Sequence, residues 1–166
     1  MGVVLKLQGH IFTYQGEYHK AHQIFLECLR YFEQRHEISY RANVRAFLGI
    51  IARLRGEYPQ AKGFLEEALE TMGDFGDRAH TAYVLRELGY LAIAVGDYAR
   101  AEATMREGAE IFEELDRRHA LVFPLDGLGT VARLQGNFDE ADRLHHKSLA
   151  ICRDLDERRG IALCLN

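Results

Sequence analysis

The chain has 166 residues, enough for one ordinary domain, and 48% of them are apolar, as in most soluble globular proteins. Lysine and arginine total 21 against 25 aspartates and glutamates, which gives a formal net charge of −4. This mild acidity argues against a general nucleic-acid or membrane-surface binder, because such proteins normally carry a basic excess.

One phrase recurs four times along the chain. The copies read YQGEYHKAHQIFLECL from residue 14, RLRGEYPQAKGFLEEAL from residue 53, AVGDYARAEATMREGA from residue 94 and RLQGNFDEADRLHHKSL from residue 133. Its glycine stands at 16, 56, 96 and 136, a constant spacing of 40 residues. A fixed period between 20 and 50 residues is typical of a solenoid, whereas a catalytic motif usually occurs once.

Each period contains two helical patterns. Between residues 78 and 95, apolar and small residues stand at i, i+3, i+4 and i+7, which is one face of a helix. Gly96 then ends this helix, and Asp97 caps the next one. We therefore predict an all-α superhelix of four helix-turn-helix repeats, over 2–37, 38–77, 78–117 and 118–157. Residues 158–166 repeat the start of a fifth, and the whole chain, 1–166, forms one domain.

The two prolines and a row of small residues add detail to this prediction. We expect Pro59 in the first turn of a second helix and Pro124 in the first turn of a first helix, where a missing N–H matters little. Small residues recur in one register of the second helices, where they let two helices approach closely: Cys28, Ala68, Gly108 and Ser148.

These repeats resemble those of the tetratricopeptide repeat family. The family's Leu-Gly pair of the first helix stands at 48–49, 88–89 and 128–129, and its alanine of the second helix at 21, 61, 101 and 141. The period is 40 residues instead of 34, a longer type that resembles repeats of bacterial regulators and signalling ATPases. The resemblance implies a solenoid that binds other proteins.

By the same resemblance, a stripe of first-helix residues lines a concave groove. The predicted groove residues are Lys6, His10, Asn43, Phe47, Arg53, Tyr83, Arg86, Tyr90, Phe123, Asp126 and Arg133. They combine aromatic side chains with an excess of cations, which suits a peptide with acidic and apolar groups. Gly127 interrupts the stripe, and it either opens space in the groove or is simply tolerated there.

No catalytic, metal or cofactor site is predicted, and we expect no enzyme. The tripeptide 74–76 matches the metal-binding DFG of kinases but lies in a turn between repeats without the other kinase motifs. His19 and His22 could share a metal, but a third convergent ligand is missing. Cys152 shares its register with apolar residues and reads as a core residue.

The predicted function is a protein–protein interaction module within a larger regulatory or signalling protein. One alternative is the ligand-sensing solenoid of a transcriptional regulator, which binds a small molecule or signalling peptide. Another is a self-associating module, a homo-oligomer formed through its ends, because 158–166 is apolar where a solenoid normally has a polar cap. The odd cysteine count, three, fits no disulfide framework and favours a cytoplasmic location, and no apolar run is long enough for a membrane span.

Overall fold

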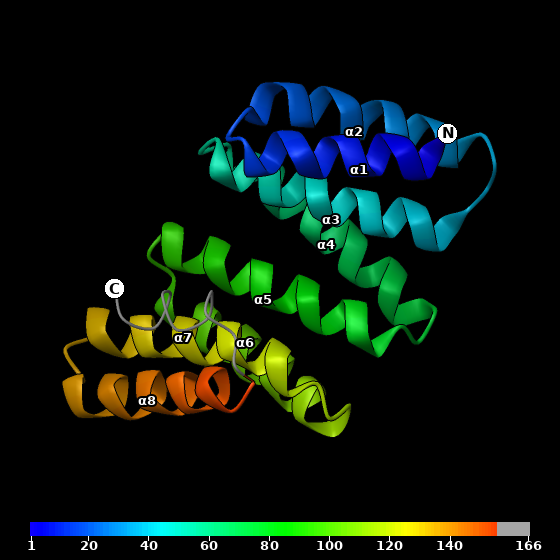
Figure 1. Ribbon diagram of the computed structural model, residues 1–166. Coiled ribbons are helices and arrows are strands. Elements are labelled where there is room, and N and C mark those ends of the chain that lie inside the picture. The colour runs from blue at the N-terminus through cyan, green and yellow to red at the C-terminus, as the bar shows by residue number, and fades with distance from the viewer. Residues whose placement is uncertain (156–166) are drawn as a thin grey trace. The chain divides into compact units, whose positions relative to one another are not determined.

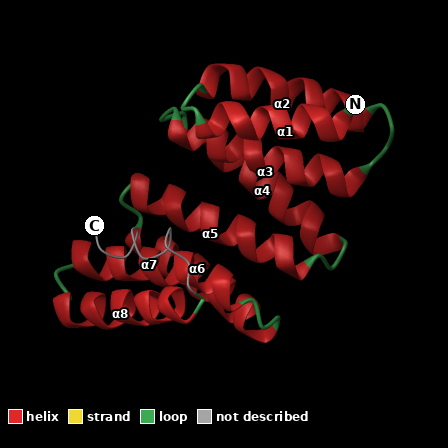
Figure 2. Ribbon diagram, viewed as in Figure 1, coloured by secondary structure: helices red, strands yellow, loops and turns green. Residues whose placement is uncertain are grey.

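Helices make up the regular structure of the chain. The computed structural model describes residues 1–155, and this part contains eight α-helices and no strand (Figures 1 and 2). In chain order they are α1 (Gly2–Tyr14), α2 (Tyr18–Glu33), α3 (Ile38–Leu54), α4 (Tyr58–Asp74), α5 (Arg78–Ala94), α6 (Tyr98–Glu114), α7 (Arg118–Leu134) and α8 (Phe138–Asp154). The predicted all-α class of helix-turn-helix repeats is confirmed. The predicted start of a fifth repeat lies outside the described residues.

The chain divides into two compact units, residues up to Val84 and residues from Leu85 onward. In the first unit α1 packs on α2, α2 on α3 and α3 on α4; in the second, α6 packs on α7 and α7 on α8. Every one of these pairs consists of neighbours in sequence, which is the packing rule of a solenoid. The extension of one domain over the whole chain stays a prediction. None of the described helices combines the length and apolar character that a membrane crossing requires.

A left-handed glycine ends the first helix of every repeat. Gly16, Gly56, Gly96 and Gly136 have φ between +75° and +80°. After the last of them, the Asn137 N–H donates to the Ala132 carbonyl at 2.9 Å, the outer bond of a Schellman motif. The next helix then starts two residues later, so the turn geometry repeats with the glycine.

Capping follows the sequence at the start of α6. The Asp97 carboxylate accepts the Arg100 N–H at 3.1 Å, so the predicted N-cap is confirmed. The tripeptide 74–76 lies at the end of α4 and in the turn that follows, as expected.

The prediction for Pro124 is wrong. Pro59 lies in the first turn of α4 as expected, but Pro124 is the seventh residue of α7. At that point it cannot supply the N–H that the Ala120 carbonyl would receive in a regular helix. Its side chain is fully buried in the register that Val44 and Val84 fill in earlier repeats, so the position demands an apolar group. The helix nevertheless continues to Leu134.

The small residues of the second helices allow close contact within a hairpin. Cys28 Sγ lies 3.4 Å from the Gly2 carbonyl oxygen, and the Ser148 hydroxyl donates to the Val122 carbonyl at 3.1 Å. The two contacts occupy the same register, and both side chains are fully buried. Cys152 is buried in the core, as predicted.

Candidate partner-binding site

The predicted groove residues all lie on the first helices of their repeats. In the first unit α1 carries Lys6 and His10, α3 carries Asn43, Phe47 and Arg53, and α5 carries Tyr83. In the second unit α5 carries Arg86 and Tyr90, and α7 carries Phe123, Asp126 and Arg133. We describe the two sets separately.

In the first unit, four predicted residues form one cluster between α1 and α3. The Lys6 ammonium donates to Asn43 Oδ1 at 3.5 Å. The His10 ring meets the Phe47 ring edge-on, with 4.3 Å between centroids, and Phe47 stacks on the buried Phe25. Burial lowers the pKa of His10, and the nearby Lys6 cation lowers it further. Both effects favour the neutral form of the His10 ring within this aromatic cluster.

Three further predicted residues differ in exposure. Arg53 and Tyr83 are half-buried, and the Tyr83 ring lies 6.3 Å from the His80 ring on the same helix. Arg133 is exposed near the end of α7. Of the three, Arg133 presents the most accessible charge to a partner.

In the second unit, Arg86, Tyr90 and Phe123 join α5 to α7. The Arg86 guanidinium lies over the Phe123 ring, 5.0 Å from its centroid. The Tyr90 hydroxyl donates to the Phe123 carbonyl oxygen at 3.0 Å. The Phe123 side chain stays exposed. We call these three residues the Phe123 surface, in which an exposed aromatic ring is held by contacts to a neighbouring helix.

Glu87 changes the electrostatics of this surface. Arg86 donates through Nε and Nη2 to Glu87 Oε1, at 3.0 and 2.6 Å, and the Glu87 side chain is buried. The arginine predicted to hold a partner's carboxylate is therefore already paired with one. This pair is hard to predict from the sequence, because residues i and i+1 on a helix usually point apart. The positive excess available to a partner is smaller than the residue list indicates.

Asp126 is likewise paired within the chain. Its Oδ1 lies 3.1 Å from Nδ1 of His145 on α8. Burial raises the pKa of the Asp126 carboxyl, while the interaction with His145 opposes this shift. Sequence reasoning missed the pair, although there was a signal. His145 is the one polar residue in a register that otherwise holds Phe25, Leu65 and Met105.

Gly127 has a packing role. A Cβ at this position would lie 2.3 Å from Met105 Sδ on α6. A Cβ at Gly89 on α5 would lie 2.5 Å from Met105 Cγ. The fully buried Met105 thus occupies the space left by two glycines, which accounts for a glycine inside α7 without reference to a groove.

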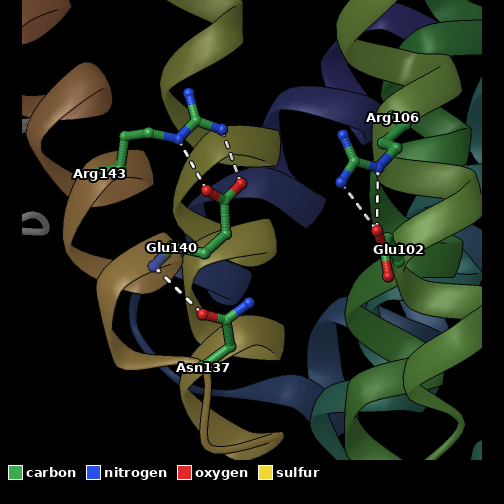
Figure 3. A network of polar contacts seen from close by, with 5 residues as sticks. All are labelled: Glu102, Arg106, Asn137, Glu140 and Arg143. Atoms are coloured by element: carbon green, nitrogen blue, oxygen red, sulfur yellow. Dashed lines mark hydrogen bonds and ion pairs between the residues drawn. The ribbon is translucent and has the colours of Figure 1, made fainter.

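A separate cleft lies between α6 and α8, on the second helices, where the sequence predicted no site. It has a volume of about 260 Å³, and Leu128, Val131 and Ala132 of α7 are among its lining residues. Figure 3 shows the polar residues near it. Glu102 pairs with Arg106 at 2.8 Å, Glu140 pairs with Arg143 at 2.6 Å, and Asn137 accepts the Glu140 N–H. Each ion pair is formed within one helix and is exposed, so the pairs contribute little to stability.

Metal ligands do not gather in the described part of the chain. Among residues 1–155, no group of three His, Cys, Asp or Glu side chains could hold a metal ion. The free thiols described, Cys28 and Cys152, are both buried, and burial raises the pKa of Cys28.

Comparison with protein families identifies the repeats. Models of the tetratricopeptide repeat match residues 40–114 and 125–159. The chain belongs to the tetratricopeptide repeat family. Tetratricopeptide repeats form a protein-interaction scaffold, so the coarse functional prediction holds. No curated protein sequence matches the chain.

Solved structures share the tetratricopeptide fold at low sequence identity. BtubC (BKLC) from P. vanneervenii is 21% identical with a TM-score of 0.80, covering 94% of this chain and 65% of that one. Aspartyl phosphate phosphatase F from Bacillus subtilis is 11% identical with a TM-score of 0.88, covering 98% and 43%. A Rap protein complexed with Competence and Sporulation Factor is 16% identical with a TM-score of 0.88, covering 96% and 45%. The chain thus spans less than two thirds of each structure, and the likeness concerns the fold alone.

Proposed function

We propose that this chain is a non-catalytic interaction module that binds a peptide or protein segment along its first helices. The observation that carries the proposal is the Phe123 surface, an exposed aromatic ring flanked by arginine and tyrosine on a tetratricopeptide scaffold. Aromatic and arginine side chains dominate the energetics of protein interfaces. The similar Rap protein in complex with a separate factor supports a binding role for this kind of scaffold.

The Phe123 surface is well suited to binding because it is organised before a partner arrives. The Tyr90 hydrogen bond and the Arg86 contact restrict the Phe123 segment of α7, so less ordering is needed on association. Since Glu87 neutralises Arg86, an apolar or aromatic partner side chain is the best match for the ring itself.

An acidic group of the partner has a better target at Arg133. This exposed residue is ten positions after Phe123 on α7, or about 15 Å along a helix axis. An extended peptide covers that distance with about five residues. We therefore propose a ligand with an aromatic or large apolar side chain and a carboxylate about five residues away.

Selection from a phage-displayed random peptide library tests this proposal, followed by calorimetric titration of synthetic copies of the selected peptides. Phe123→Ala should weaken binding about tenfold, which corresponds to about 1.4 kcal/mol. Arg133→Gln should weaken it for the peptides that carry a carboxylate. Phe75→Ala is the matched control, because Phe75 is also exposed but lies in the turn after α4. Peptides that bind Phe123→Ala as well as the original chain would contradict the proposal.

The ligand-sensing alternative has one structural feature in its favour. A cleft of about 410 Å³ lies among the ends of α6 and α8 and the start of α7, with Phe112, Leu121 and Ile151 among its lining residues. Small-molecule sites commonly have volumes of about 300–1,000 Å³. A thermal-shift screen with a metabolite set tests it, and a true ligand should lose its effect in Leu121→Ala. Membership of a larger regulatory protein and a cytoplasmic location are proposals that rest on the sequence analysis.

A further inference from the structure

Two clefts join into a groove between the second helices α6 and α8. The cleft of about 260 Å³ shares Arg106, Leu128 and Leu144 with a further cleft of about 190 Å³. Because they share lining residues, the two clefts follow one another along α7. Glu102 of the first cleft and Glu113 of the second are about 16 Å apart along the axis of α6. This α6–α8 groove therefore has the length of about three helical turns.

The α6–α8 groove has an apolar strip with charged residues around it. Helix α7 packs on both α6 and α8, and its buried Leu125, Leu128 and Val131 are among the lining residues of the clefts. Ala109 of α6 and Leu144 of α8 add to the strip. A partner helix suits such a strip better than an extended segment does, because its backbone N–H and C=O groups are already paired.

The charge of the chain is divided between the first and the second helices. Helices α1, α3, α5 and α7 carry eight lysines and arginines against two carboxylates, a net charge of +6. Helices α2, α4, α6 and α8 carry eight against fifteen, a net charge of −7. The two helices that flank the groove, α6 and α8, account for −4 of this, with five cations against nine carboxylates. Charge complementarity therefore favours a basic partner.

Two carboxylates line one cleft from opposite sides. Glu102 lies on α6 and Glu140 on α8, and each is paired with an arginine of its own helix (Figure 3). The pKa of Glu140 is lowered chiefly by its hydrogen bond with Arg143, and also by the charge of Arg106 on α6. The charges of the two helices thus act on each other across the cleft. Since exposed pairs within a helix are weak, a partner's cation can compete for both carboxylates.

The first unit already contains a cation in the equivalent groove, between α2 and α4. Arg45 of α3 lies 3.7 Å from a carboxylate oxygen of Glu33 on α2 and 3.0 Å from one of Glu67 on α4. The Arg45 side chain is 19% exposed, while the two carboxylates stay open to solvent. Eighty positions later, α7 has Leu125 in place of this arginine. A guanidinium from α7 is therefore missing in the α6–α8 groove.

Lys147 supplies a different bridge at the other end of the groove. It stands eighty positions after Glu67, and its ammonium donates to Glu113 of α6 at 3.3 Å. This bridge occupies the second cleft, so a partner's cation has its best place in the first cleft, between Glu102 and Glu140. An apolar side chain of the partner then lies next to Leu125.

We propose that the α6–α8 groove binds a basic amphipathic helix of a partner protein. Its apolar residues would cover the strip of α7, and an arginine or lysine would enter between Glu102 and Glu140 as Arg45 does between its two carboxylates. The groove belongs to the second helices, so the inference goes beyond peptide binding on the first helices and stands without it.

Fluorescence anisotropy with three labelled peptides of about fourteen residues tests the proposal on the full chain. The first peptide is a helix with leucines on one face and arginines beside them. The second has the same composition with the leucines spread around the helix, and the third has glutamate in place of arginine. We expect the first peptide to bind at least about tenfold more tightly than either of the others.

Paired substitutions locate the binding site. Glu102→Gln together with Glu140→Gln should weaken binding of the first peptide at least about tenfold. The matched control is Glu66→Gln together with Glu70→Gln, which removes the same charge from α4, a helix with the same net charge as α6. The control should change the affinity by less than about twofold. Phe123→Ala should have no effect, which separates this site from the one proposed on the first helices.

Three results would overturn the proposal. Equal binding of the first two peptides would indicate attraction by charge without a groove. Equal weakening by the two pairs of substitutions would place the effect in the general acidity of the second helices. Failure of the first peptide to bind would exclude a basic helix as the occupant. Because the substituted side chains are not buried, circular dichroism should show unchanged helix content and melting in every variant.

Discussion

Two residues other than glycine hold a left-handed backbone between repeats. His36 and Asp116 have φ of 55° and 52°. Gly76 holds the equivalent position in the turn after α4, with φ of 64°. A residue with a Cβ pays about 1–2 kcal/mol for this conformation, while glycine loses more entropy on folding. The chain thus contains one strain-free version of a turn that it uses three times.

Replacing these residues by glycine should stabilise the protein. We expect His36→Gly and Asp116→Gly each to raise the free energy of unfolding by up to about 1 kcal/mol, because relief of backbone strain exceeds the added unfolded-state entropy. Thermal melting measures the change. The reverse substitution, Gly76→His, should lower the melting temperature, and a rise there would contradict the strain argument.

Asp126 should give the protein a pH-dependent stability. Its folded-state pKa is raised chiefly by burial, so the folded chain binds the proton more tightly than the unfolded chain. The contribution is therefore fully present at low pH, below the unfolded pKa, and is lost as pH rises through the folded pKa. Asp126→Asn should raise the melting temperature at about pH 7.5, where the buried carboxylate is most costly, and have little effect at about pH 3.

A second aspartate–histidine pair provides the control for this measurement. Asp142 and His146 lie 3.5 Å apart on α8, and both side chains are exposed. Asp142→Asn should leave the pH profile of melting nearly unchanged, since exposed pairs contribute little. If Asp126→Asn were destabilising at neutral pH, the pairing with His145 would outweigh burial.

Among the helices, α7 contains a buried proline in its interior, where the ring fills the core but interrupts the helical hydrogen bonding. Pro124 interrupts its hydrogen bonding, and an interior proline costs about 3 kcal/mol in a helix. Pro124→Val restores an N–H to Ala120 and places in α7 the side chain that Val44 and Val84 supply in α3 and α5. We expect a gain of about 1–3 kcal/mol, measured by urea unfolding. An equal loss would mean that α7 is built around the proline.

Helix spacing around α6 depends on two glycines and one methionine. Gly127→Ala should destabilise the chain by about 1–3 kcal/mol, because its methyl group would overlap Met105. In a Met105→Ala background the same substitution should cost much less, and a double-mutant cycle gives the coupling. Gly63→Ala is the control, since nothing lies near its Cβ position in α4, and it should stabilise by up to about 1 kcal/mol.

At the scale of the whole molecule, stability should be distributed by neighbourhood. In a repeat protein each helix pair depends chiefly on the next one in sequence. Gly127→Ala should therefore speed amide hydrogen exchange in α6, α7 and α8 and leave α1 and α2 close to their original rates. Mass spectrometry of exchanged peptides measures this. Uniform acceleration along the chain would indicate one fully cooperative structure.

Most of the fold could be predicted from the sequence because its determinants are local. Gly96 ends α5 and Asp97 caps α6 through their own backbone and nearest neighbours. The constant period then transferred each assignment to the other repeats, and the family followed from the Leu-Gly and alanine positions. Pro124 was misplaced because burial in the tertiary structure outweighed a local preference.

The positions of the candidate residues on the helices could be predicted, but their interactions could not. Sequence position alone determined that the stripe residues lie on the first helices, because helix and register are periodic properties. Only the tertiary structure decided that Arg86 forms an ion pair with Glu87 and that Asp126 pairs with His145. It also decided that Met105 fills the space beside Gly127. Whether a side chain is paired or exposed depends on what the adjoining helices bring to it, and a one-dimensional repeat does not contain that information.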